Sequence, residues 1–311
     1  MTSRRLGPIG RFFGRVFGVA RAGETRRDPD ATEEYPMPHF QGDLKLRVGV
    51  ISVVGNYRDH NEDNYYVPGR MPVQFDAPPE KSSEMSASIL EASNLFIVAD
   101  GMGGQQAGEQ ASLMAIQLLP RSLARRLPLD ANDAAAVQKA VRDAVGEVNH
   151  EIMGSAGVAP ELANMGTTVV LALFRKDRVY VAGMGDSRAY RLRRGVLEQL
   201  TRDHSLADAL SEAGTITPEE VPHHKFKNML YLYLGCKDAR DGPEEVRVLD
   251  VQVGDRFLLA SDGLTGVVSD DVLAQLLGEG DDPQETARTM KDLALHNGSK
   301  DNVTSLVIHV V

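Results

Sequence analysis

Four aspartates of this 311-residue sequence lie beside segments that are typical of strands, and two of them directly follow apolar runs. Asp100 follows such a run and is succeeded by glycine, and Asp262 repeats this pattern. The other two are Asp63, which ends a polar segment, and Asp301, which precedes the last apolar run. A carboxylate at the end of a buried strand is costly unless it is paired or bound to a cation. If these side chains converge in the fold, the pattern predicts a metal site.

An Asp-Gly pair alone more often marks a tight turn than a site. Asp241-Gly242 is an example, because its neighbours at 237–240 are polar and would not bring the carboxylate to the edge of a core. The metal interpretation therefore needs three or four acids to meet. Oxygen ligands without Cys or His partners favour Mg²⁺ or Mn²⁺ over zinc. Two such cations would bridge a water, lower its pKa and orient it for in-line attack on a phosphoryl group.

Other catalytic groups fit the sequence less well. A cysteine phosphatase needs an arginine six residues after its nucleophile, and after Cys236 that position is Gly242. Ser187 lies in a Gly-Asp-Ser-Arg-Ala segment that lacks the last glycine of a serine-hydrolase elbow. The glycine-rich segment 101–104 has no P-loop lysine. These comparisons leave the aspartates as the strongest candidates for catalysis.

The composition is that of a soluble globular protein. Its 44 acids against 34 bases give a net charge of −10, which suits hard cations and disfavours nucleic acid as a partner. The single cysteine excludes an intramolecular disulfide and a Cys-rich zinc site. The sequence has no apolar run of the length, about 18 residues, that is needed to span a bilayer. We therefore expect a cytoplasmic protein.

The pattern of strands and helices predicts an α+β fold. Strand-like runs occur at 46–54, 95–99, 167–174, 178–184, 246–250, 256–260 and 303–310. Helical periodicity fits 105–127, 133–153, 270–277 and 284–295. Strands follow one another between 167 and 200 with connections too short for parallel crossovers, so antiparallel pairing is expected. Both faces of 168–174 are apolar, as in a strand that lies between two layers.

The chain is predicted to divide into a basic tail and one folded body. Residues 1–27 carry seven arginines against one acid, a net charge of +6, interleaved with apolar side chains. This composition fits a disordered tail or a segment that contacts an anionic membrane surface, and both interpretations stay open. Prolines at 28–43 indicate a linker, and the body begins at Leu44. Residues 69–93, rich in Pro, Ser and Glu, are predicted to be an exposed insertion.

An ordered set of segments resembles the metal-dependent protein phosphatase family, PPM or type 2C, over about residues 45–311. The compact bacterial members that oppose serine/threonine kinases are the most similar. The segments are Arg58-x-x-Asn61-Glu62-Asp63, Asp100-Gly101-Met102-Gly103-Gly104, Gly166-Thr167-Thr168, Gly185-Asp186-Ser187-Arg188, Asp203-His204-Ser205, Ser261-Asp262-Gly263 and Asp301-Asn302. The resemblance implies two stacked antiparallel β-sheets flanked by helix pairs, a four-layer αββα sandwich, with a binuclear Mn²⁺ or Mg²⁺ site at one edge.

The resemblance also implies a role for each aspartate. Asp63 would bridge the two cations. Asp100 and the Gly101 carbonyl would complete one cation site, and Asp262 and Asp301 would complete the other.

Three further residues take roles beside these two sites under the same resemblance. Glu62 would hold a metal-bound water, and Asp186 together with Asp262 would bind a third, weaker cation. Arg58 would clamp the phosphate, because its guanidinium fork matches two phosphoryl oxygens.

Two departures from the family pattern concern the leaving group and the substrate. Met102 stands where eukaryotic members place a histidine, so the general acid is unassigned, with His60 and a metal-bound water as alternatives. The family usually has a small residue and an arginine in the segment that is here 231–235. Substrate contacts of the flap, about residues 204–245, are therefore expected to differ. Within the flap, the sequence at 217–220 predicts a capping box and a short helix.

The expected function is metal-dependent hydrolysis of phosphoserine and phosphothreonine in proteins, in opposition to a serine/threonine kinase. A non-catalytic regulatory binding module is the alternative from another class, but every ligand aspartate is present. An anti-sigma-factor phosphatase would share the chemistry and differ only in its substrate. We expect a monomer whose partners are phosphoproteins and a kinase. The basic tail would add a peripheral contact at the inner face of the membrane.

Overall fold

The computed structural model describes residues 45–68, 83–85, 94–127, 133–158, 162, 164–239 and 241–311. The chain divides into two units, residues 1–43 and 44–311, and every described element belongs to the second. The predicted tail and linker lie outside the described residues, and so does the predicted insertion at 69–93 except for residues 83–85.

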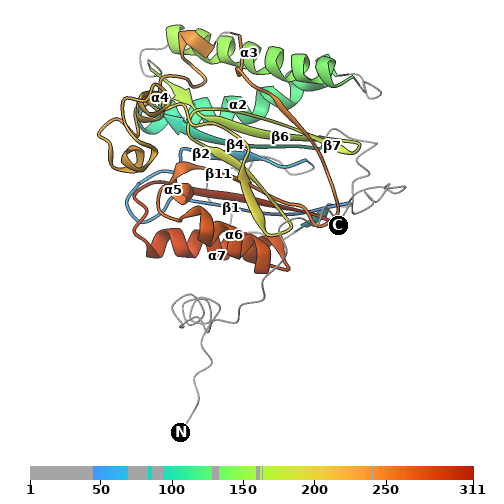
Figure 1. Cartoon of the computed structure of the whole chain (residues 1–311). Helices are drawn as coiled ribbons and strands as arrows, with labels where there is room; N and C mark the ends of the chain where they lie inside the picture. Colours follow the sequence, from blue (N-terminus) through green and yellow to red (C-terminus); the bar gives the residue numbers. More distant parts are fainter. Residues whose placement is uncertain are drawn as a thin grey trace. The chain divides into compact units, whose positions relative to one another are not determined.

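Two antiparallel sheets, stacked face to face, form the centre of the second unit (Figure 1). The strands are β1 (Leu46–Val53), β2 (Asp63–Tyr66), β3 (Ser83–Met85), β4 (Asn94–Met102), β5 (Gly166–Thr167), β6 (Val169–Arg175), β7 (Arg178–Met184), β8 (Arg188–Arg193), β9 (Val196–Gln199), β10 (Arg247–Asp250), β11 (Arg256–Ala260) and β12 (Val303–Val310). Sheet A has the order β3-β1-β12-β11-β8-β9, and sheet B has the order β10-β7-β6-β4-β2, with β5 paired to β4. The predicted strands are all present, and the one at 167–174 is divided at Thr168 into β5 and β6.

Helix pairs cover the outer faces of both sheets (Figure 1). α2 (Gln105–Arg126) and α3 (Ala134–Val158) pack on sheet B, whereas α6 (Asp270–Glu279) and α7 (Pro283–His296) pack on sheet A. The shorter elements are α4 (Leu206–Glu212), α5 (Asp262–Thr265), η2 (Pro218–His223) and η3 (Lys237–Ala239). The α+β class and the four-layer αββα arrangement predicted from the sequence are therefore confirmed.

The core between the sheets is built from alternating side chains of both sheets. Phe174 of β6 lies between Phe96 of β4 and Phe257 of β11, with ring centroids 5.8 and 5.2 Å apart in edge-to-face geometry. The other face of β6 packs against α2 and α3, so six of its seven residues are buried. This two-sided burial is why the strand is apolar on both faces. Because this close-packed core fixes the two sheets relative to one another, it also fixes the relative positions of the strand ends from which the edge loops start.

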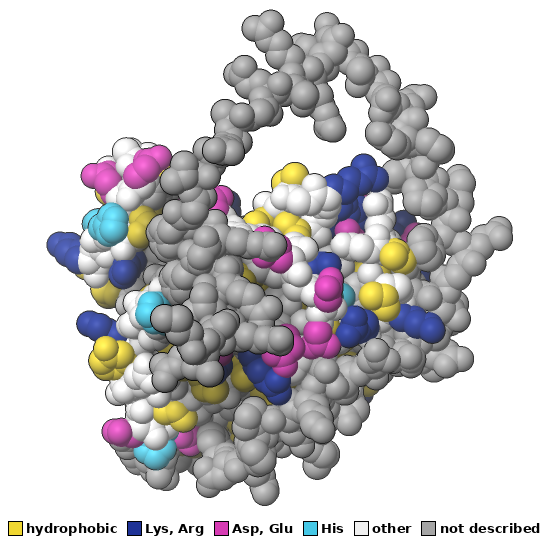
Figure 2. All heavy atoms as spheres, turned by 90° about the horizontal axis from the view of Figure 1, so that it is seen from below, with side chains coloured by type: hydrophobic (Ala, Val, Ile, Leu, Met, Phe, Trp, Pro, Cys, Tyr) yellow, Lys and Arg dark blue, Asp and Glu magenta, His cyan; other side chains and the backbone are white. Residues whose placement is uncertain are grey.

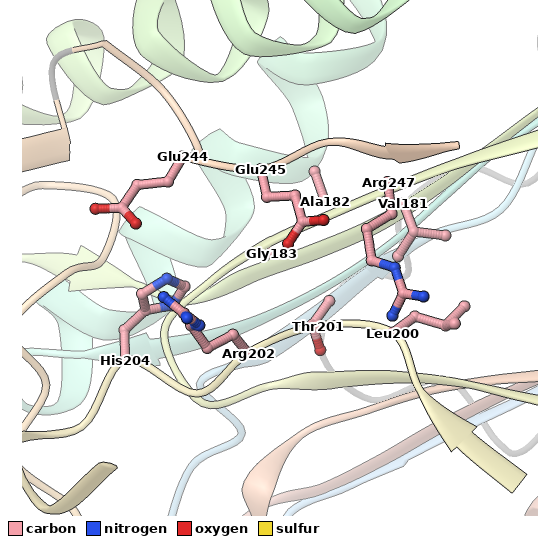
Figure 3. A pocket seen from close by; sticks show the side chains of 10 residues that line it. All are labelled: Val181, Ala182, Gly183, Leu200, Thr201, Arg202, His204, Glu244, Glu245 and Arg247. Carbon is pink, nitrogen blue, oxygen red and sulfur yellow. The ribbon is translucent and has the colours of Figure 1, made fainter. Parts of the chain in front are cut away.

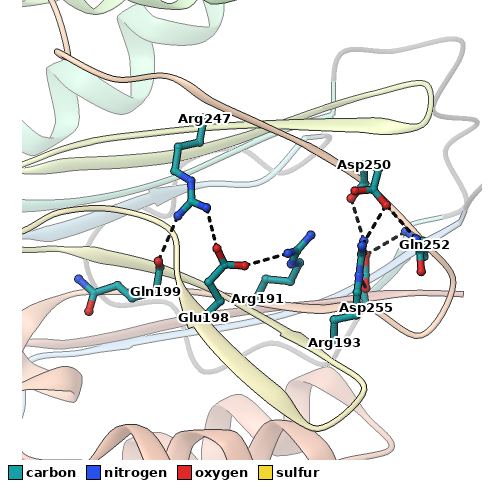
Figure 4. A network of polar contacts seen from close by, with 8 residues as sticks. All are labelled: Arg191, Arg193, Glu198, Gln199, Arg247, Asp250, Gln252 and Asp255. Carbon is teal, nitrogen blue, oxygen red and sulfur yellow. Dashed lines mark hydrogen bonds and ion pairs between the residues drawn. The ribbon is translucent and has the colours of Figure 1, made fainter. Parts of the chain in front are cut away.

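Ion pairs join the two sheets along one side of the sandwich (Figure 4). Arg247 of β10 in sheet B donates to Glu198 of β9 in sheet A at 2.6 Å. Arg193 of β8 reaches Asp250 at the end of β10 at 2.9 Å and also pairs with Asp255, which is buried. The network connects β9 and β10, which are edge strands of the two sheets. It therefore stabilises the mutual position of the sheets near the root of the flap.

The described surface carries both signs of charge. On the described part of the face in Figure 2, Lys and Arg side chains are interspersed with Asp and Glu, and hydrophobic side chains are scattered. This part of the surface has no extended basic area of the kind that tracks a nucleic-acid backbone. In the part of the chain that the structure describes, no helix is long and apolar enough to cross a membrane.

Candidate metal centre

The four predicted aspartates come together at one edge of the sandwich. Asp63 is the first residue of β2 and lies directly opposite Asp100 in the register of β2 with β4, both in sheet B. Asp262 begins α5 immediately after β11, and Asp301 comes just before β12. Since β11 and β12 are antiparallel neighbours in sheet A, the end of one lies beside the start of the other. Each sheet therefore supplies two acids to the same edge.

Asp63 joins the two sheets through its side chain. Its Oδ2 accepts hydrogen bonds from Ser261 Oγ at 2.7 Å and from Thr304 Oγ1 at 2.6 Å, and both donors belong to sheet A segments. The other oxygen, Oδ1, is buried and has no hydrogen-bond partner, and the same is true of Asp262 Oδ1. A buried carboxylate oxygen without a donor is costly, so these two atoms fit coordination of a cation.

The electrostatics of the cluster point the same way. Burial, with smaller contributions from neighbouring carboxylates, raises the pKa of Asp63 to about 7 and the pKa of Asp262 to about 6. Burial and repulsion from Asp63 also raise the pKa of Asp100 well above its ordinary value. Acids that repel one another in a buried site are stabilised either by protons or by a cation. The donor set is made of oxygen, as Mg²⁺ and Mn²⁺ prefer.

The acids also make contacts with one another and with Arg58. Among the described residues, no three Asp, Glu, His or Cys side chains are arranged around one point as metal ligands. Asp262 instead shares a hydrogen bond with Asp100, and Asp301 Oδ2 accepts from Arg58 Nη2 at 2.6 Å. Both contacts use carboxyl oxygens, so a cation at this edge would compete with a proton and with Arg58 for them. The buried Oδ1 atoms of Asp63 and Asp262, which have no hydrogen-bond partner, are available to a cation.

Asp100 is held by its backbone as well. Its N–H donates to Thr168 Oγ1 at 3.0 Å. Its carbonyl accepts from Thr168 N at 2.8 Å and from Thr167 Oγ1 at 2.9 Å. Both threonines are almost completely buried. The strand end that carries Asp100 is therefore fixed by the segment between β5 and β6.

Asp186 lies in a tight turn between β7 and β8. Gly185 before it has φ +101°, and a Cβ at this position would come within 2.6 Å of the Thr168 side chain, so only glycine fits. The Gly185 carbonyl accepts from the His204 N–H at 3.0 Å, and Ser187 Oγ lies 2.7 Å from Thr168 Oγ1. Burial, with repulsion from Asp262 and others, raises the pKa of Asp186 to about 8. Asp186 thus lies close enough to Asp262 for the two carboxyls to repel one another.

Asn302 holds the loop that carries Arg58 and Glu62. Its Nδ2 donates to the carbonyls of Val54 and His60 at 2.9 and 2.8 Å, and its Oδ1 accepts from the Glu62 N–H at 2.9 Å. The side chain is 2% exposed. The sequence shows Asn302 in a motif but assigns it no role. Its three hydrogen-bond partners lie about 240 positions away in the chain, so the sequence alone does not reveal them.

Glu62 and Gly101 meet α2 at close range. The Glu62 carbonyl accepts from the Gly101 N–H at 3.1 Å and from Ser112 Oγ at 2.6 Å. A Cβ on Gly108 of α2 would lie 2.2 Å from Glu62 Oε2, so a glycine there leaves room for the carboxyl. Burial raises the pKa of Glu62. Gly108 is a residue that sequence reasoning missed, and its signal is a glycine in the first turn of a helix.

His60, a predicted alternative for the general acid, lies at the surface of the same loop. Its side chain is 54% exposed, and its Nδ1 is 3.6 Å from Glu109 Oε1 at the start of α2. The ring is therefore accessible to a substrate. No general acid is assigned by this geometry alone.

The flap is anchored beside the acidic cluster. Thr167 and Leu234 form an isolated antiparallel bridge, and so do Ser205 and Leu230. The predicted short helix is present as η2, and its Glu220 side chain accepts from the Thr217 N–H at 2.8 Å. The flap is thus connected at Leu234 to the segment that holds Asp100, and at His204 to the turn that carries Asp186.

A small cavity lies between the flap root and the edges of the two sheets (Figure 3). Its volume is about 40 Å³, enough for water molecules but not for a phosphopeptide. His204 and Arg202 line one end and Arg247 lines the other. None of the clustered aspartates lines it, so this cavity is not the candidate site. The acidic cluster is therefore identified as the candidate site by its buried carboxyls and not by a cavity.

The chain is similar to known phosphatases. A family model described as protein phosphatase 2C matches residues 84–299, a range that leaves out Asp63 and Asp301. The serine/threonine phosphatase stp of Listeria monocytogenes is 36% identical over 256 residues, which cover 82% of this chain and 92% of that protein.

Solved structures show the same similarity. The serine/threonine phosphatase Stp1 from Staphylococcus aureus has a TM-score of 0.70 at 30% identity, covering 86% of this chain and 95% of that one. The catalytic domain of the phosphatase PstP, in complex with two manganese ions, has a TM-score of 0.66 at 33% identity and covers 86% of this chain and 99% of that one.

Proposed function

The chain belongs to the protein phosphatase 2C family, and from this premise we propose that its acidic cluster binds two Mn²⁺ or Mg²⁺ ions and hydrolyses phosphoserine and phosphothreonine in proteins. The observation that carries this proposal is the meeting of four aspartates from two sheets at one edge, with two buried carboxylate oxygens that no protein group satisfies. A related phosphatase, PstP, is described in complex with two manganese ions.

The residues divide between the two cations by their position. Asp63, which contacts both sheets, would bridge them. Asp100 with the Gly101 carbonyl would complete the site on the sheet B side, and Asp262 with Asp301 the site on the sheet A side. When bound, the cations supply a bridging water of lowered pKa and positive charge for the phosphoryl oxygens.

Two residues act beside these ligands. Asp186, with Asp262, would take a third, weaker cation, because burial and Asp262 already raise the pKa of Asp186. Glu62 would hold a water next to the cations; its carboxyl lies in the space that Gly108 leaves open.

Arg58 binds the phosphate in this proposal. Its guanidinium is half exposed and ends at Asp301, so it stands at the mouth of the cluster with donors available to a ligand. A guanidinium can contact two phosphoryl oxygens at once, which orients the ester for in-line displacement. Asn302 keeps the loop of Arg58 in place through three hydrogen bonds. The leaving serine or threonine oxygen needs a proton, and His60 is the protein group that the loop offers for it.

The substrates are phosphoproteins, and the activity opposes a serine/threonine kinase. The alternative of a non-catalytic regulatory module is not favoured, since none of the acids is replaced and the relatives are named as phosphatases. We propose that the protein acts as a monomer in the cytoplasm. We also propose that the arginines of residues 1–27 make a peripheral contact with anionic lipid.

The test is hydrolysis of p-nitrophenyl phosphate and of a phosphothreonine peptide, each with Mn²⁺, with Mg²⁺ and with EDTA. We expect turnover of both substrates with a metal ion and none with EDTA. Asp63→Asn is the matched control, because it keeps the side-chain shape and removes the bridging charge. Turnover in EDTA, or full Mn²⁺-dependent turnover by Asp63→Asn, would overturn the proposal.

A further inference from the structure

Thr168 touches two separate parts of the acidic cluster. It lies between β5 and β6, is 1% exposed, and uses a single hydroxyl for both contacts. On one side, Thr168 Oγ1 accepts from the Asp100 N–H at 3.0 Å. On the other side, it lies 2.7 Å from Ser187 Oγ, next to Asp186. Asp100 belongs to β4 and Asp186 to the turn between β7 and β8, so the two acids are far apart in the chain.

The hydroxyl chemistry allows both contacts at once. A threonine hydroxyl has one donor and two acceptor positions. Because the Asp100 N–H uses one acceptor position, either the donor or the second acceptor position serves the Ser187 hydroxyl. Loss of the Thr168 hydroxyl would therefore leave a backbone N–H without its partner and free the turn that carries Asp186 on one side.

The methyl group of Thr168 makes a third contact. A Cβ on Gly185 would come within 2.6 Å of Thr168 Cγ2, so the methyl fills the space directly against the Gly185 backbone. The turn that carries Asp186 is thus held at the residue before it by packing and at the residue after it by a hydrogen bond.

We propose that Thr168 is a positioning residue that fixes Asp186 relative to Asp100 and so joins the Asp186 carboxyl to the binuclear cluster. The proposal rests on the proposed function of that cluster. Thr168 itself would touch neither cation nor substrate. Outer-shell hydrogen bonds of this kind orient metal ligands, and their removal typically weakens metal binding by about 10-fold to 100-fold.

The experiment compares Thr168→Val with Thr201→Val. Thr201 is the control, because its Oγ1 also accepts a backbone N–H, that of Ala189, at 3.0 Å, in a strand, β8, that carries none of the clustered acids. Valine keeps the shape of threonine and removes the hydroxyl. Mn²⁺ binding is measured by isothermal titration calorimetry, and unfolding by urea is measured in EDTA.

We expect both valine variants to lose stability in EDTA, since each leaves one backbone N–H unpaired, and Thr168→Val to lose more, since it also removes the partner of the buried Ser187 hydroxyl. Only Thr168→Val should weaken Mn²⁺ binding, by about 10-fold or more. Thr168→Ser should restore Mn²⁺ binding to within a few-fold of the unchanged protein, because it keeps the hydroxyl. Equal Mn²⁺ binding by Thr168→Val and Thr201→Val would overturn the proposal.

Ser187→Ala keeps the proposal testable if Thr168→Val does not fold. It removes only the bond on the Asp186 side and leaves the Asp100 bond in place. We expect it to lower the number or affinity of Mn²⁺ ions bound, and unchanged binding would contradict the proposed link. Absence of Mn²⁺ binding by the unchanged protein would instead count against the proposed function, so the two failures are distinguishable.

Discussion

Asp63 and Asp100 lie directly opposite one another in the antiparallel register of β2 and β4. Side chains at paired positions point to the same face of a sheet, and like charges at such positions are destabilising. Asp63 is nonetheless buried, with 4% of its surface exposed, and Asp100 is partly buried. The fold therefore keeps two repelling acids together at a place where hydrophobic or oppositely charged residues would be more stable. This cost is explained if the site is selected for binding cations and not for stability.

The first prediction concerns Asp262→Asn and Asp301→Asn. Each change removes one anionic oxygen from a cluster of mutually repelling carboxyls, so metal-dependent turnover should be almost lost while the metal-free protein stays folded. Stability in EDTA should be unchanged or slightly raised, as measured by urea unfolding. Full Mn²⁺-dependent turnover by either variant would refute its assignment as a ligand.

A second prediction follows from the pKa values of Asp63, about 7, and Asp186, about 8, both raised mainly by burial. The folded chain holds protons that the unfolded chain has already lost, so the free energy of unfolding should fall as the pH rises and should level off above about pH 8. His309, whose pKa is lowered to about 4 by burial, acts in the opposite direction only below 6.5. The effect is therefore cleanest above that pH.

Urea unfolding in EDTA between about pH 6.5 and pH 8.5 measures this effect. Asp186→Asn is the matched control and should show a smaller fall in the upper half of the range. Added Mn²⁺ should reverse the trend, because the cation competes with protons for the same carboxyls. Metal-free stability that stays level or rises across this range would show that the acids are not protonated in the folded chain.

Much of the site could be predicted because its signals are local. An apolar run followed by Asp-Gly marks Asp100 and Asp262, and the same apolar runs gave the strands of both sheets. The turn at Asp241-Gly242 was distinguished in the same way, and its Gly242 N–H donates to the Ala239 carbonyl at 3.0 Å. The hydrophobic periodicity of a strand or helix and the Gly, Pro, Asn or Asp residues that bound it are properties of neighbouring residues, so a single sequence is enough to find them.

The hydrogen bonds that position these acids could not be predicted. Asn302 contacts residues more than 200 positions away, and Thr168 contacts Asp100 and Ser187 from a third segment. A polar side chain that makes such bonds looks like any other Asn or Thr until the fold brings its partners close. β3 was also missed, because a three-residue edge strand leaves almost no periodic signal.

A third prediction concerns Arg58, which pairs with Asp301 at 2.6 Å. Arg58→Ala should lower kcat/KM for a phosphopeptide by about 100-fold, because the phosphate loses a two-point contact. Affinity for Mn²⁺ should be unchanged or higher, since Asp301 no longer has a competing partner. Arg58→Lys should not restore kcat/KM, because lysine offers a point charge in place of a fork. Weaker Mn²⁺ binding by Arg58→Ala would point to a structural role for the arginine.

The fourth prediction concerns residues 1–27, with their net charge of +6. If these arginines hold the enzyme on anionic lipid, their removal should abolish sedimentation with vesicles that contain phosphatidylserine. Turnover of p-nitrophenyl phosphate should not change, and vesicles of phosphatidylcholine alone serve as the control. Equal sedimentation of the full chain and the truncated chain would show that residues 1–27 do not bind the lipid, and would favour the interpretation of these residues as a disordered tail.

The last prediction concerns the insertion at 69–93, which separates Asp63 from Asp100. β2 runs away from the acidic edge and β4 runs back to it, so the connection between them lies at the opposite end, roughly 15 Å away at about 3.3 Å per residue. β3, within this insertion, agrees with that geometry, because it pairs with Leu46–Val48, whereas the other end of β1 pairs with Val303 beside Asp301.

Replacement of residues 72–92 by a short Gly-Asn turn should therefore keep metal-dependent hydrolysis of p-nitrophenyl phosphate within a few-fold of the unchanged protein. Stability should fall only modestly, since the deletion removes one three-residue edge strand from sheet A. Mn²⁺ affinity and turnover are measured on the folded variant. A 100-fold loss of either would mean that the insertion reaches back over the acidic edge, and that chain direction alone does not locate it.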